Sequence, residues 1–560
     1  MKLRLLPAVL FLGIFFFLPL GRILALSLAP LSQLDAALFS RLADVLRFTF
    51  FQAAASSLLT VLFGLPLAFL FARVDFPLKP FLRTLTAIPF MLPTVVVAAA
   101  FNALLGPRGW FNLALMSALG LSQPPIIFLG TLGAILAAHV FYNATIVIRL
   151  VGNAWANLDP RLGQAARSLG ASPASVFWQV TLPLLRPALL AATLLVFLFD
   201  FTSYGVILLL GGPKFSTIEV EIALQALQML NLPAAALLSL IQLLCTLTFS
   251  VLYTRSLSRL AAPLKPVPQT PRRAQTRLER LLVASLVCVL LMFYALPLLA
   301  LPLRSISRLE AQRGQRTASG PALTLEYYTE LFINRRGSIF YIPPATAARN
   351  SLAYAGLTVA CSLLLGFPAA QALARPGRLE KWLDPLLLLP LGASAVTLGL
   401  GYLLTFNRPL VPFLVPGRGL ALSFLASPLI VPLAHTTIAL PFVIRSLQAA
   451  LATIPPRYRE AAAVLGASPW QVWWQVDWKI LSRALVSAGA FAFTVSLGEF
   501  GAASLLARPE YPTLPTAIFR FLSQPGGMNY GQALAMATIL MTITGLAIGL
   551  IEKERVAGEF

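Results

Sequence analysis

The chain has 560 residues, of which 58% are hydrophobic and only 11% are charged, and its formal net charge is +22. A soluble domain needs far more polar surface than this composition supplies, so the composition predicts a membrane protein. The positive charge does not indicate nucleic acid binding, because most Lys and Arg residues lie in short stretches between apolar segments, as loops on a bilayer require.

Apolar segments of about 20 residues, the length of a helix that spans a bilayer, recur along the whole chain. The first segment follows two basic residues, as a signal peptide does, but it is long and is followed by further membrane segments. We therefore interpret it as an uncleaved first helix. The twelve predicted spans are residues 5–28, 48–72, 84–105, 127–148, 188–211, 232–254, 281–303, 350–374, 383–405, 422–444, 484–507 and 531–551.

Positive charges in the loops orient these spans. With the N-terminus in the cytoplasm, the inner loops carry most of the Lys and Arg residues, as the positive-inside rule requires. The outer loop 304–349 is also basic, but long translocated loops obey the rule poorly. We expect an inner-membrane protein with both termini in the cytoplasm.

A polar segment with four prolines, residues 257–280, divides the chain near its middle. Its composition is typical of a linker. We predict a first half at 1–256, a linker at 257–280 and a second half at 281–560, with six spans in each half.

The two halves are copies of one plan. G-L-P-L-A-F-L-F-A-R from Gly64 matches G-F-P-A-A-Q-A-L-A-R from Gly366, which lies 302 residues later. An even number of spans separates the copies, so the sequence predicts a parallel repeat about an axis along the membrane normal. A second series of residues, His139, Arg149, Pro160, Gly170, Trp178 and Gly205, recurs 296 residues later as His435, Arg445, Pro456, Gly466, Trp474 and Gly501.

The most similar stretch of the repeat lies in a predicted cytoplasmic loop of each half. It reads R-L-G-Q-A-A-R-S-L-G-A-S-P from Arg161 and R-Y-R-E-A-A-A-V-L-G-A-S-P from Arg457. Each copy predicts a helix that ends at a left-handed glycine, followed by a serine that caps a second helix with proline at its first position. A single such helix pair would equally fit an interfacial amphipathic segment. Two matched copies favour a docking surface.

The E-A-A…G pattern at Glu460 to Gly466 resembles the loop with which permeases of binding-protein-dependent ABC importers contact their ATPase subunits. The resemblance covers essentially the whole chain. It implies an all-α polytopic membrane protein with the type I ABC importer permease fold, and it implies coupling loops at 160–187 and 456–483. The residues implied to contact the ATPase are Gln164, Ala165, Ala166, Gly170, Ala171 and Ser172, and Glu460, Ala461, Ala462, Gly466, Ala467 and Ser468.

The two coupling loops depart from that pattern in different ways. Gln164 replaces the usual Glu in the first loop, and Trp478-Lys479 replaces the Leu-Pro that the first loop retains at Leu182-Pro183. We expect the halves to grip their ATPase subunits unequally.

The chain contains no G-x-x-x-x-G-K-[ST] sequence, which a nucleotide-binding P-loop requires. We therefore expect a translocation subunit and not an enzyme. It would bind no cofactor of its own, because ATP and Mg would be held by a separate ATPase, a pair of identical subunits. A solute-binding protein outside the cytoplasm would deliver the substrate.

Ionisable residues inside spans are costly and point to function. Asp200 and Glu499 lie on the span after each coupling loop, where the two halves should meet, and two acids suit a cation. Tyr204 and Phe500, at equivalent positions, are placed to stack on an aromatic ring. These four residues are the candidate translocation path, although hydrogen bonding within the bundle explains the acids equally well.

Other polar groups indicate packing and not chemistry. The two histidines sit on otherwise apolar segments without a ligand set, and the three cysteines lie in apolar segments without a CxxC or Cys/His cluster, so we predict no metal site.

The sequence is compatible with more than one substrate. The chain resembles the fused thiamine permeases in G-G-P-K-F-S-T-I-E-V-E-I-A-L-Q-A-L from Gly211 and in T-L-P-T-A-I-F from Thr513. Fused ferric-iron permeases share its size and architecture, and G-E-F-G from Gly498 resembles the molybdate and sulfate permeases, which move anions. Thiamine or one of its phosphates is the favoured substrate, and ferric iron or an oxyanion are the alternatives.

The sequence also argues against two further classes of protein. An ion-coupled secondary carrier would need no ATPase, so the paired coupling loops argue against it. A membrane-embedded enzyme would need a nucleophile, base and orienting group, and the sequence offers no such set.

Overall fold

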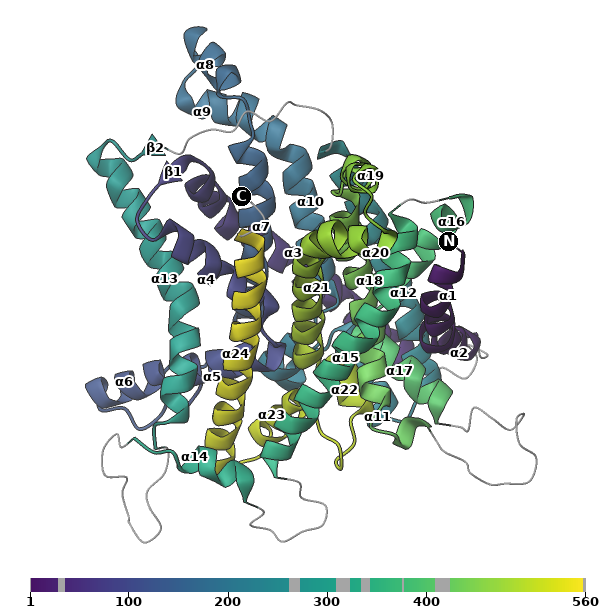
Figure 1. The fold of residues 1–560 in the computed structure, drawn as a ribbon. Helices are drawn as coiled ribbons and strands as arrows, with labels where there is room; N and C mark the ends of the chain where they lie inside the picture. Colours follow the sequence, from purple (N-terminus) through teal and green to yellow (C-terminus); the bar gives the residue numbers. More distant parts are fainter. Residues whose placement is uncertain are drawn as a thin grey trace, which may run out of the picture.

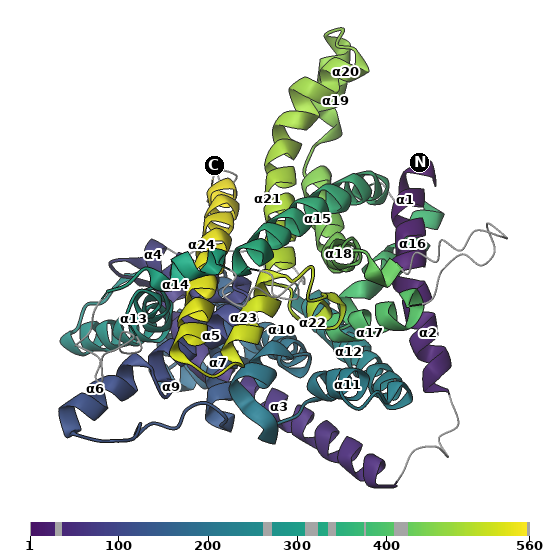
Figure 2. The ribbon, with the colours of Figure 1, turned by 90° about the horizontal axis from the view of Figure 1, so that it is seen from below.

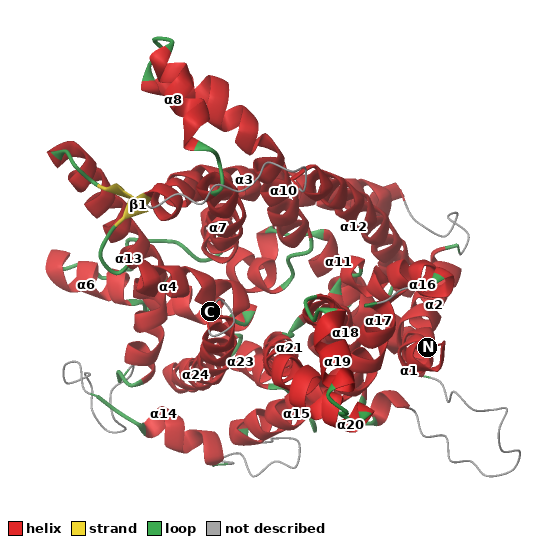
Figure 3. Ribbon diagram, turned by 45° about the horizontal axis from the view of Figure 1, so that its top comes forward, coloured by secondary structure: helices red, strands yellow, loops and turns green. Residues whose placement is uncertain are grey.

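A computed structural model describes residues 2–28, 36–260, 272–308, 323–333, 343–374, 377–407 and 424–556. Nearly all of them are helical, and the only paired strands among the described residues are β1 (Val74–Asp75) and β2 (Arg272–Arg273), which run parallel (Figure 3). The long helices cross the molecule in roughly one direction (Figure 1).

The predicted spans correspond to long helices or to pairs of shorter ones. In the first half these are α1 (Lys2–Leu12) continued by η1 (Gly13–Phe17) and α2 (Leu18–Ser27), α3 (Ala36–Arg73), α4 (Lys79–Met91) with α5 (Thr94–Leu105), α7 (Leu132–Ala156), α10 (Leu182–Phe201) and α12 (Leu232–Leu260). In the second half they are α13 (Arg277–Ser305), α15 (Pro344–Leu373), α16 (Arg378–Leu388) with η7 (Leu389–Gly392) and α17 (Ala395–Phe406), α18 (Ile430–Ala452), α21 (Trp478–Gly498) and α24 (Gly527–Val556).

Shorter helices connect these spans. They are α6 (Trp110–Leu119), α8 (Pro160–Ser168), α9 (Pro173–Val176), η3 (Phe177–Thr181), η4 (Ile207–Gly211), η5 (Gly212–Lys214), α11 (Ile218–Leu227), α14 (Glu326–Thr329), η6 (Glu330–Phe332), η8 (Phe424–Ala426), α19 (Pro456–Val464), α20 (Pro469–Val472), η9 (Trp473–Asp477), α22 (Gly501–Leu506) and α23 (Leu514–Leu522).

Ten helices among the described residues are long and apolar enough to cross a membrane, or twelve if each of two bent pairs is counted as one span. This confirms the predicted all-helical polytopic membrane protein. The bent pairs fall on the predicted spans 84–105 and 383–405, where the chain turns by 112° and 99°. Pro93 and Pro390 lie at or next to these bends. Proline lacks a backbone N–H donor and disfavours a helical conformation in the residue before it, which explains why the helices are interrupted there.

Two further predicted spans are also interrupted. The span 188–211 stops being α-helical at Phe201 and resumes only as the short helix η4, and the span 484–507 breaks between Gly498 and Gly501. Each break contains only a few polar residues, Thr202 and Ser203 in one and Glu499 in the other, and apolar residues flank both, so the hydropathy pattern did not reveal the breaks.

The first helix of each half packs against the opposite half (Figure 2). α1 and α2 contact α15 and α17, and Leu12 and Phe16 share a core with Tyr402. Reciprocally, α13 contacts α4 and α5, and its Tyr294 packs on Phe141 at 5.3 Å between ring centroids. The two halves therefore exchange their first helices.

The division into halves and linker stays a prediction. α12 continues to Leu260 and α13 begins at Arg277, so both helices extend into the predicted linker, and residues 261–271 lie outside the described part of the chain. Half of the basic outer loop 304–349 also lies outside the described part of the chain, at 309–322 and 334–342.

The repeated glycines Gly64 and Gly366 explain a close helix crossing that occurs in both halves. A Cβ on Gly64 would lie 2.7 Å from Cβ of Val147, and a Cβ on Gly366 would lie 2.9 Å from Cγ1 of Val443. Small residues at such positions let membrane helices approach closely. α3 therefore packs directly on α7, and α15 packs directly on α18.

Replacing Gly366 with Val should destabilise the protein, because the added side chain would overlap Val443. The expected loss of unfolding free energy is about 1–3 kcal/mol, as for other overpacked cores. Gly356→Val is the matched control on the same helix, since a Cβ there meets no atom within 4 Å. Thermal unfolding of the two purified variants in detergent should give a lower midpoint for Gly366→Val, and equal midpoints would contradict the crossing.

Candidate functional site

The two predicted coupling loops project from the same end of the molecule, at which both chain ends also lie (Figure 1). The first comprises α8, α9 and η3, and the second comprises α19, α20 and η9. Each second helix continues into a long span, α10 or α21. The repeat has therefore placed two equivalent surfaces on one side of the protein.

The local geometry of both loops confirms the predicted helix–turn–helix. Gly170 and Gly466 have φ values of +88° and +82°, which is the left-handed conformation that glycine adopts without strain. The next helix in each loop is capped by serine, since Ser172 Oγ accepts a hydrogen bond from Ser175 N at 3.2 Å and Ser468 Oγ accepts one from Gln471 N at 3.3 Å. The turn is thus built into the sequence of both copies.

Large apolar side chains are exposed on these loops. Leu169 is 89% exposed and Leu465 is 87% exposed, and both lie next to the left-handed glycines. Of the twelve predicted coupling residues, Ala166, Ala171, Ala462 and Ala467 are half-buried and the other eight are exposed. These apolar groups stand at equivalent positions of the two loops and are accessible to contact by another molecule.

The two loops are braced differently. In the second, Arg459 Nε lies 2.8 Å from Asp477 Oδ1 and joins α19 to η9. The equivalent residues of the first loop are Gly163 and Thr181, which cannot form an ion pair. This charged brace is a second difference between the copies, beyond the substitutions noted in the motif.

A cavity of about 330 Å³ lies where four helix breaks meet. It is lined by residues from each break, namely Leu92 and Thr94, Thr202 to Val206, Ala395 and Val396, and Gly498 to Gly501. Irregular backbone is tolerated at membrane depth only where protein or a water-filled cavity surrounds it. All four predicted path residues, Asp200, Tyr204, Glu499 and Phe500, line this cavity.

Tyr204 and Phe500 form its wall toward a second cavity. Their rings stack on each other with centroids 5.5 Å apart and planes 26° apart, and Ser504 Oγ donates to Tyr204 Oη at 3.2 Å. A cavity of about 470 Å³ lies on the other side of the pair, between α11 and α23. These two helices lie toward the end of the molecule opposite the coupling loops (Figure 1), so the ring pair separates an inner cavity from an outer one.

The two histidines occupy matching polar networks. His139 Nδ1 lies 2.9 Å from Ser56 Oγ and 3.5 Å from Asp200 Oδ1, and its Nε2 lies 2.9 Å from Ser203 Oγ. His139 also lines the inner cavity, so its packing role stays a prediction.

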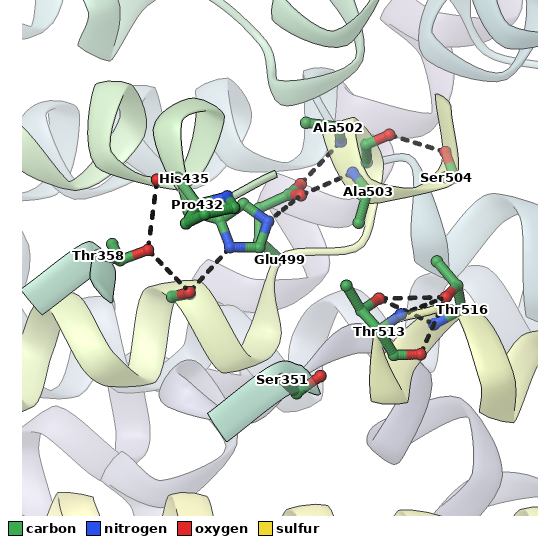
Figure 4. A network of polar contacts seen from close by, with 12 residues as sticks. Ser351, Thr358, Pro432, His435, Glu499, Ala502, Ala503, Ser504, Thr513 and Thr516 are labelled. Carbon is green, nitrogen blue, oxygen red and sulfur yellow. Dashed lines mark hydrogen bonds and ion pairs between the residues drawn. The ribbon is translucent and has the colours of Figure 1, made fainter. Parts of the chain in front are cut away.

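The second network repeats the first with an exchange. His435 Nδ1 lies 2.8 Å from Ser496 Oγ, and its Nε2 lies 3.4 Å from Glu499 Oε2 (Figure 4). Ser496 is the repeat equivalent of Asp200, and Glu499 is the equivalent of Ser203. At these two repeat positions each histidine thus meets one acid and one serine, in exchanged order, and His139 has Ser56 as a further neighbour.

Both carboxylate oxygens of Glu499 are hydrogen-bonded to backbone N–H groups. Its two carboxylate oxygens accept hydrogen bonds from Ala502 N and Ala503 N, each at 2.9 Å, and so cap the start of α22 (Figure 4). Asp200 differs, because its Oδ1 accepts from Asn143 Nδ2 at 2.7 Å while its Oδ2 has no hydrogen-bonding partner among the described residues. Both acids make packing contacts and both line the cavity.

Sequence reasoning missed a third acid at this site. Glu219, on α11, is 1% exposed and lines the inner cavity, and Gln242 Nε2 donates to its Oε1. Two acids in the otherwise apolar stretch I-E-V-E-I were the available signal. The stretch lies between two predicted spans, so it was not considered as part of the buried interior.

Comparison with known proteins places the repeat in a family. The model of a binding-protein-dependent transport system inner membrane component matches residues 61–262 and again residues 362–553. It therefore matches once in each half. A solved bacterial alginate ABC transporter, in complex with an alginate pentasaccharide-bound periplasmic protein, covers 48% of this chain and 96% of its own at 19% identity, with a TM-score of 0.38.

Similarity to curated relatives extends over nearly the whole chain. The thiamine transport system permease protein of Escherichia coli (strain K12) is 30% identical over 519 residues, which cover 92% of this chain and 89% of that protein. The proteins so named from Brucella abortus (strain 2308) and Haemophilus influenzae are 28% and 27% identical, and cover 89% and 92% of this chain and 84% and 90% of their own length.

Replacing Glu499 with Gln should loosen the start of α22, because an amide can accept only one of the two backbone hydrogen bonds. The expected loss of unfolding free energy is about 1 kcal/mol, the usual cost of a weakened helix cap. Glu510→Gln is the matched control, since that acid is exposed. The cap assignment predicts a lower thermal midpoint for Glu499→Gln alone, and a parental midpoint would refute it.

Proposed function

This chain belongs to the family of binding-protein-dependent transport system inner membrane components, and we propose that it carries thiamine into the cytoplasm. It is a fused permease of an ABC importer, with both halves of the translocation pathway in one polypeptide. The proposal for the substrate rests on one structural observation, the acidic and aromatic inner cavity between the halves, together with the thiamine permeases that match most of the chain.

The cavity suits an aromatic cation. Three carboxyl groups line it, those of Asp200, Glu219 and Glu499, and they favour a positive charge. Phe90, Tyr142, Phe199, Tyr204 and Phe500 supply ring faces and edges to the same cavity. Thiamine consists of a cationic thiazolium ring and a pyrimidine ring, so both features of the cavity match its chemistry.

The same features disfavour the alternatives. An oxyanion would meet three carboxyl groups at close range in this cavity, where like charges repel. A ferric ion needs several ligands that converge on one point, and among the described residues no group of three or more His, Cys, Asp or Glu side chains is placed to hold a metal ion. The ring pair Tyr204–Phe500, which stands between the two cavities, offers stacking surface to a flat organic ring that passes it.

The coupling surfaces orient the protein in this proposal. A separate ATPase, a pair of identical subunits that binds ATP and Mg, would contact the exposed residues of both loops, so this end lies in the cytoplasm together with both termini. The solute-binding protein then docks at the opposite end, where the outer cavity is lined by α11 and α23. The unequal bracing of the loops predicts that the second holds its ATPase subunit more rigidly.

The substrate proposal is tested by reconstitution. The permease, its ATPase and its binding protein in proteoliposomes should accumulate labelled thiamine only when ATP is present. Molybdate, sulfate and ferric iron, each offered in the same vesicles, should not accumulate. Uptake of one of these and not of thiamine would contradict the proposal.

Replacing Gly466 with Val should uncouple ATP hydrolysis from transport, because a β-branched residue resists the left-handed conformation at φ +82°. The strain is about 1–2 kcal/mol and would distort the turn that presents Leu465. Apart from its two chain neighbours, no atom of the described residues lies within 4 Å of a Cβ at this glycine, so the bulk of the side chain is not the cause. Gly466→Asn is the matched control, since Asn tolerates this conformation.

The measurement is thiamine uptake per ATP hydrolysed in proteoliposomes, with the amount of membrane-inserted protein recorded for each variant. We expect a lower ratio for Gly466→Val and a ratio near the parental one for Gly466→Asn. Unchanged uptake by Gly466→Val would remove this loop from the coupling surface.

A further inference from the structure

The inner cavity contains two acids whose hydrogen bonding is incomplete. Asp200 is fully buried and Glu219 is 1% exposed, yet Asp200 Oδ2 and Glu219 Oε2 have no hydrogen-bonding partner among the described residues. The hydroxyl of Ser394 is the other polar neighbour of Glu219. Leaving a buried carboxylate oxygen without a hydrogen-bonding partner is unfavourable, so two such oxygens around one cavity call for an explanation.

Neighbouring acids show that the incomplete pairing is selective. Glu221, two residues further along α11, lies 2.9 Å from Arg41 Nε and accepts from Ser216 Oγ and from Gln225 Nε2. Glu499 accepts two backbone N–H groups. Glu221 does not line the inner cavity, and Glu499 lines it with both oxygens already bonded.

The elements that carry Asp200 and Glu219 are held firmly against each other. Ile218 N donates to Thr49 Oγ1 at 3.0 Å, and Thr217 Oγ1 donates to Ser203 O at 3.3 Å, so the start of α11 is tied to α3 and to the break after α10. α11 also packs on α17 of the second half. The two free oxygens are therefore fixed features of the interface between the halves.

We propose that Asp200 and Glu219 form a cation subsite in the inner cavity, which holds the positively charged ring of the substrate during its passage. This inference rests on the proposed function and assigns the charge recognition to these two residues. Glu499, which sequence reasoning paired with Asp200, acts instead as the cap of α22. Aromatic walls beside the subsite, including Phe90 and Phe199 at 5.6 Å from each other, complete an environment for an aromatic cation.

The test compares transport with ATP hydrolysis in the reconstituted importer, at saturating concentrations of thiamine-loaded binding protein. Glu219→Gln keeps an acceptor for Gln242 and removes only the charge. We expect it to lower thiamine uptake roughly tenfold, the loss of one charge-assisted interaction. Binding-protein-stimulated ATP hydrolysis should stay close to parental, because the coupling loops are untouched. Asp200→Asn should behave in the same way.

Two controls separate charge recognition from a structural role. Glu219→Asp retains the charge and should retain most of the uptake per ATP hydrolysed. Glu221→Gln removes the neighbouring paired acid, and its uptake per ATP should not fall even if less protein accumulates. If Glu219→Gln does not accumulate in the membrane, Asp200→Asn and Glu219→Asp test the cation subsite instead. The quantity compared is again thiamine uptake per ATP hydrolysed.

The outcomes are distinguishable from failure of the proposed function. If the parent does not accumulate thiamine, the substrate proposal is wrong. If the parent does, and Glu219→Gln and Asp200→Asn either transport it at the parental rate or lose uptake and ATP hydrolysis in parallel, the cation subsite is overturned.

Discussion

The need to satisfy backbone polar groups away from water governs how this permease can be built. A helix break within a membrane protein frees N–H and C=O groups that lipid cannot bond. Here the breaks meet at one cavity between the halves, and polar side chains bond the groups they release. Gln52 Nε2 donates to Asp200 O at 2.8 Å, Thr246 Oγ1 donates to Gly392 O at 2.5 Å, and Ser394 Oγ accepts from Thr397 N at 3.0 Å. With Glu499 at α22, these contacts allow an irregular, polar-lined cavity to exist inside an apolar fold.

Duplication supplied this arrangement twice, and divergence then gave the copies different tasks. The acid and the serine beside each histidine have exchanged positions, which moves the carboxyl group by three residues along the chain. In the second half that shift brings Glu499 to the start of α22, where it serves as a cap. In the first half the acid stays at Asp200, inside the last turn of α10, and one of its oxygens has no hydrogen-bonding partner in the part of the chain that the structure describes. Similar residues in a repeat need not have similar roles.

The sequence predicted well whatever depends on composition and local pattern. The spans, the parallel repeat, and the turns at Gly170 and Gly466 follow from hydropathy, spacing and the conformational freedom of glycine. The exchange of α1 and α13 between halves could not be predicted, because apolar helices of similar length fit several neighbours equally well. The breaks after Met91 and Gly392 were missed because hydrophobic residues continue across them. Glu219 was missed because its neighbours looked like a connection between spans.

One continuous element links the coupling surface to the cavity in the first half. The helix from Pro173 to Phe201 has 29 residues, so it extends over about 43 Å at 1.5 Å per residue. Its first turn is capped by Ser172 in the coupling loop, and its last turn carries Asp200. The π-helical turn η3 and Pro187 lie within it, but no break in the helix separates the coupling loop from Asp200. Movement imposed on the loop by a partner would therefore reach the cavity directly, and it would arrive at the residue that we assign to charge recognition. In the second half, α20, η9 and α21 connect the other loop to Gly498, beside the Glu499 cap. The two coupling loops are thus connected to different groups at the same cavity. The first is connected to Asp200, whose Oδ2 has no partner among the described residues, and the second to Glu499, which caps α22.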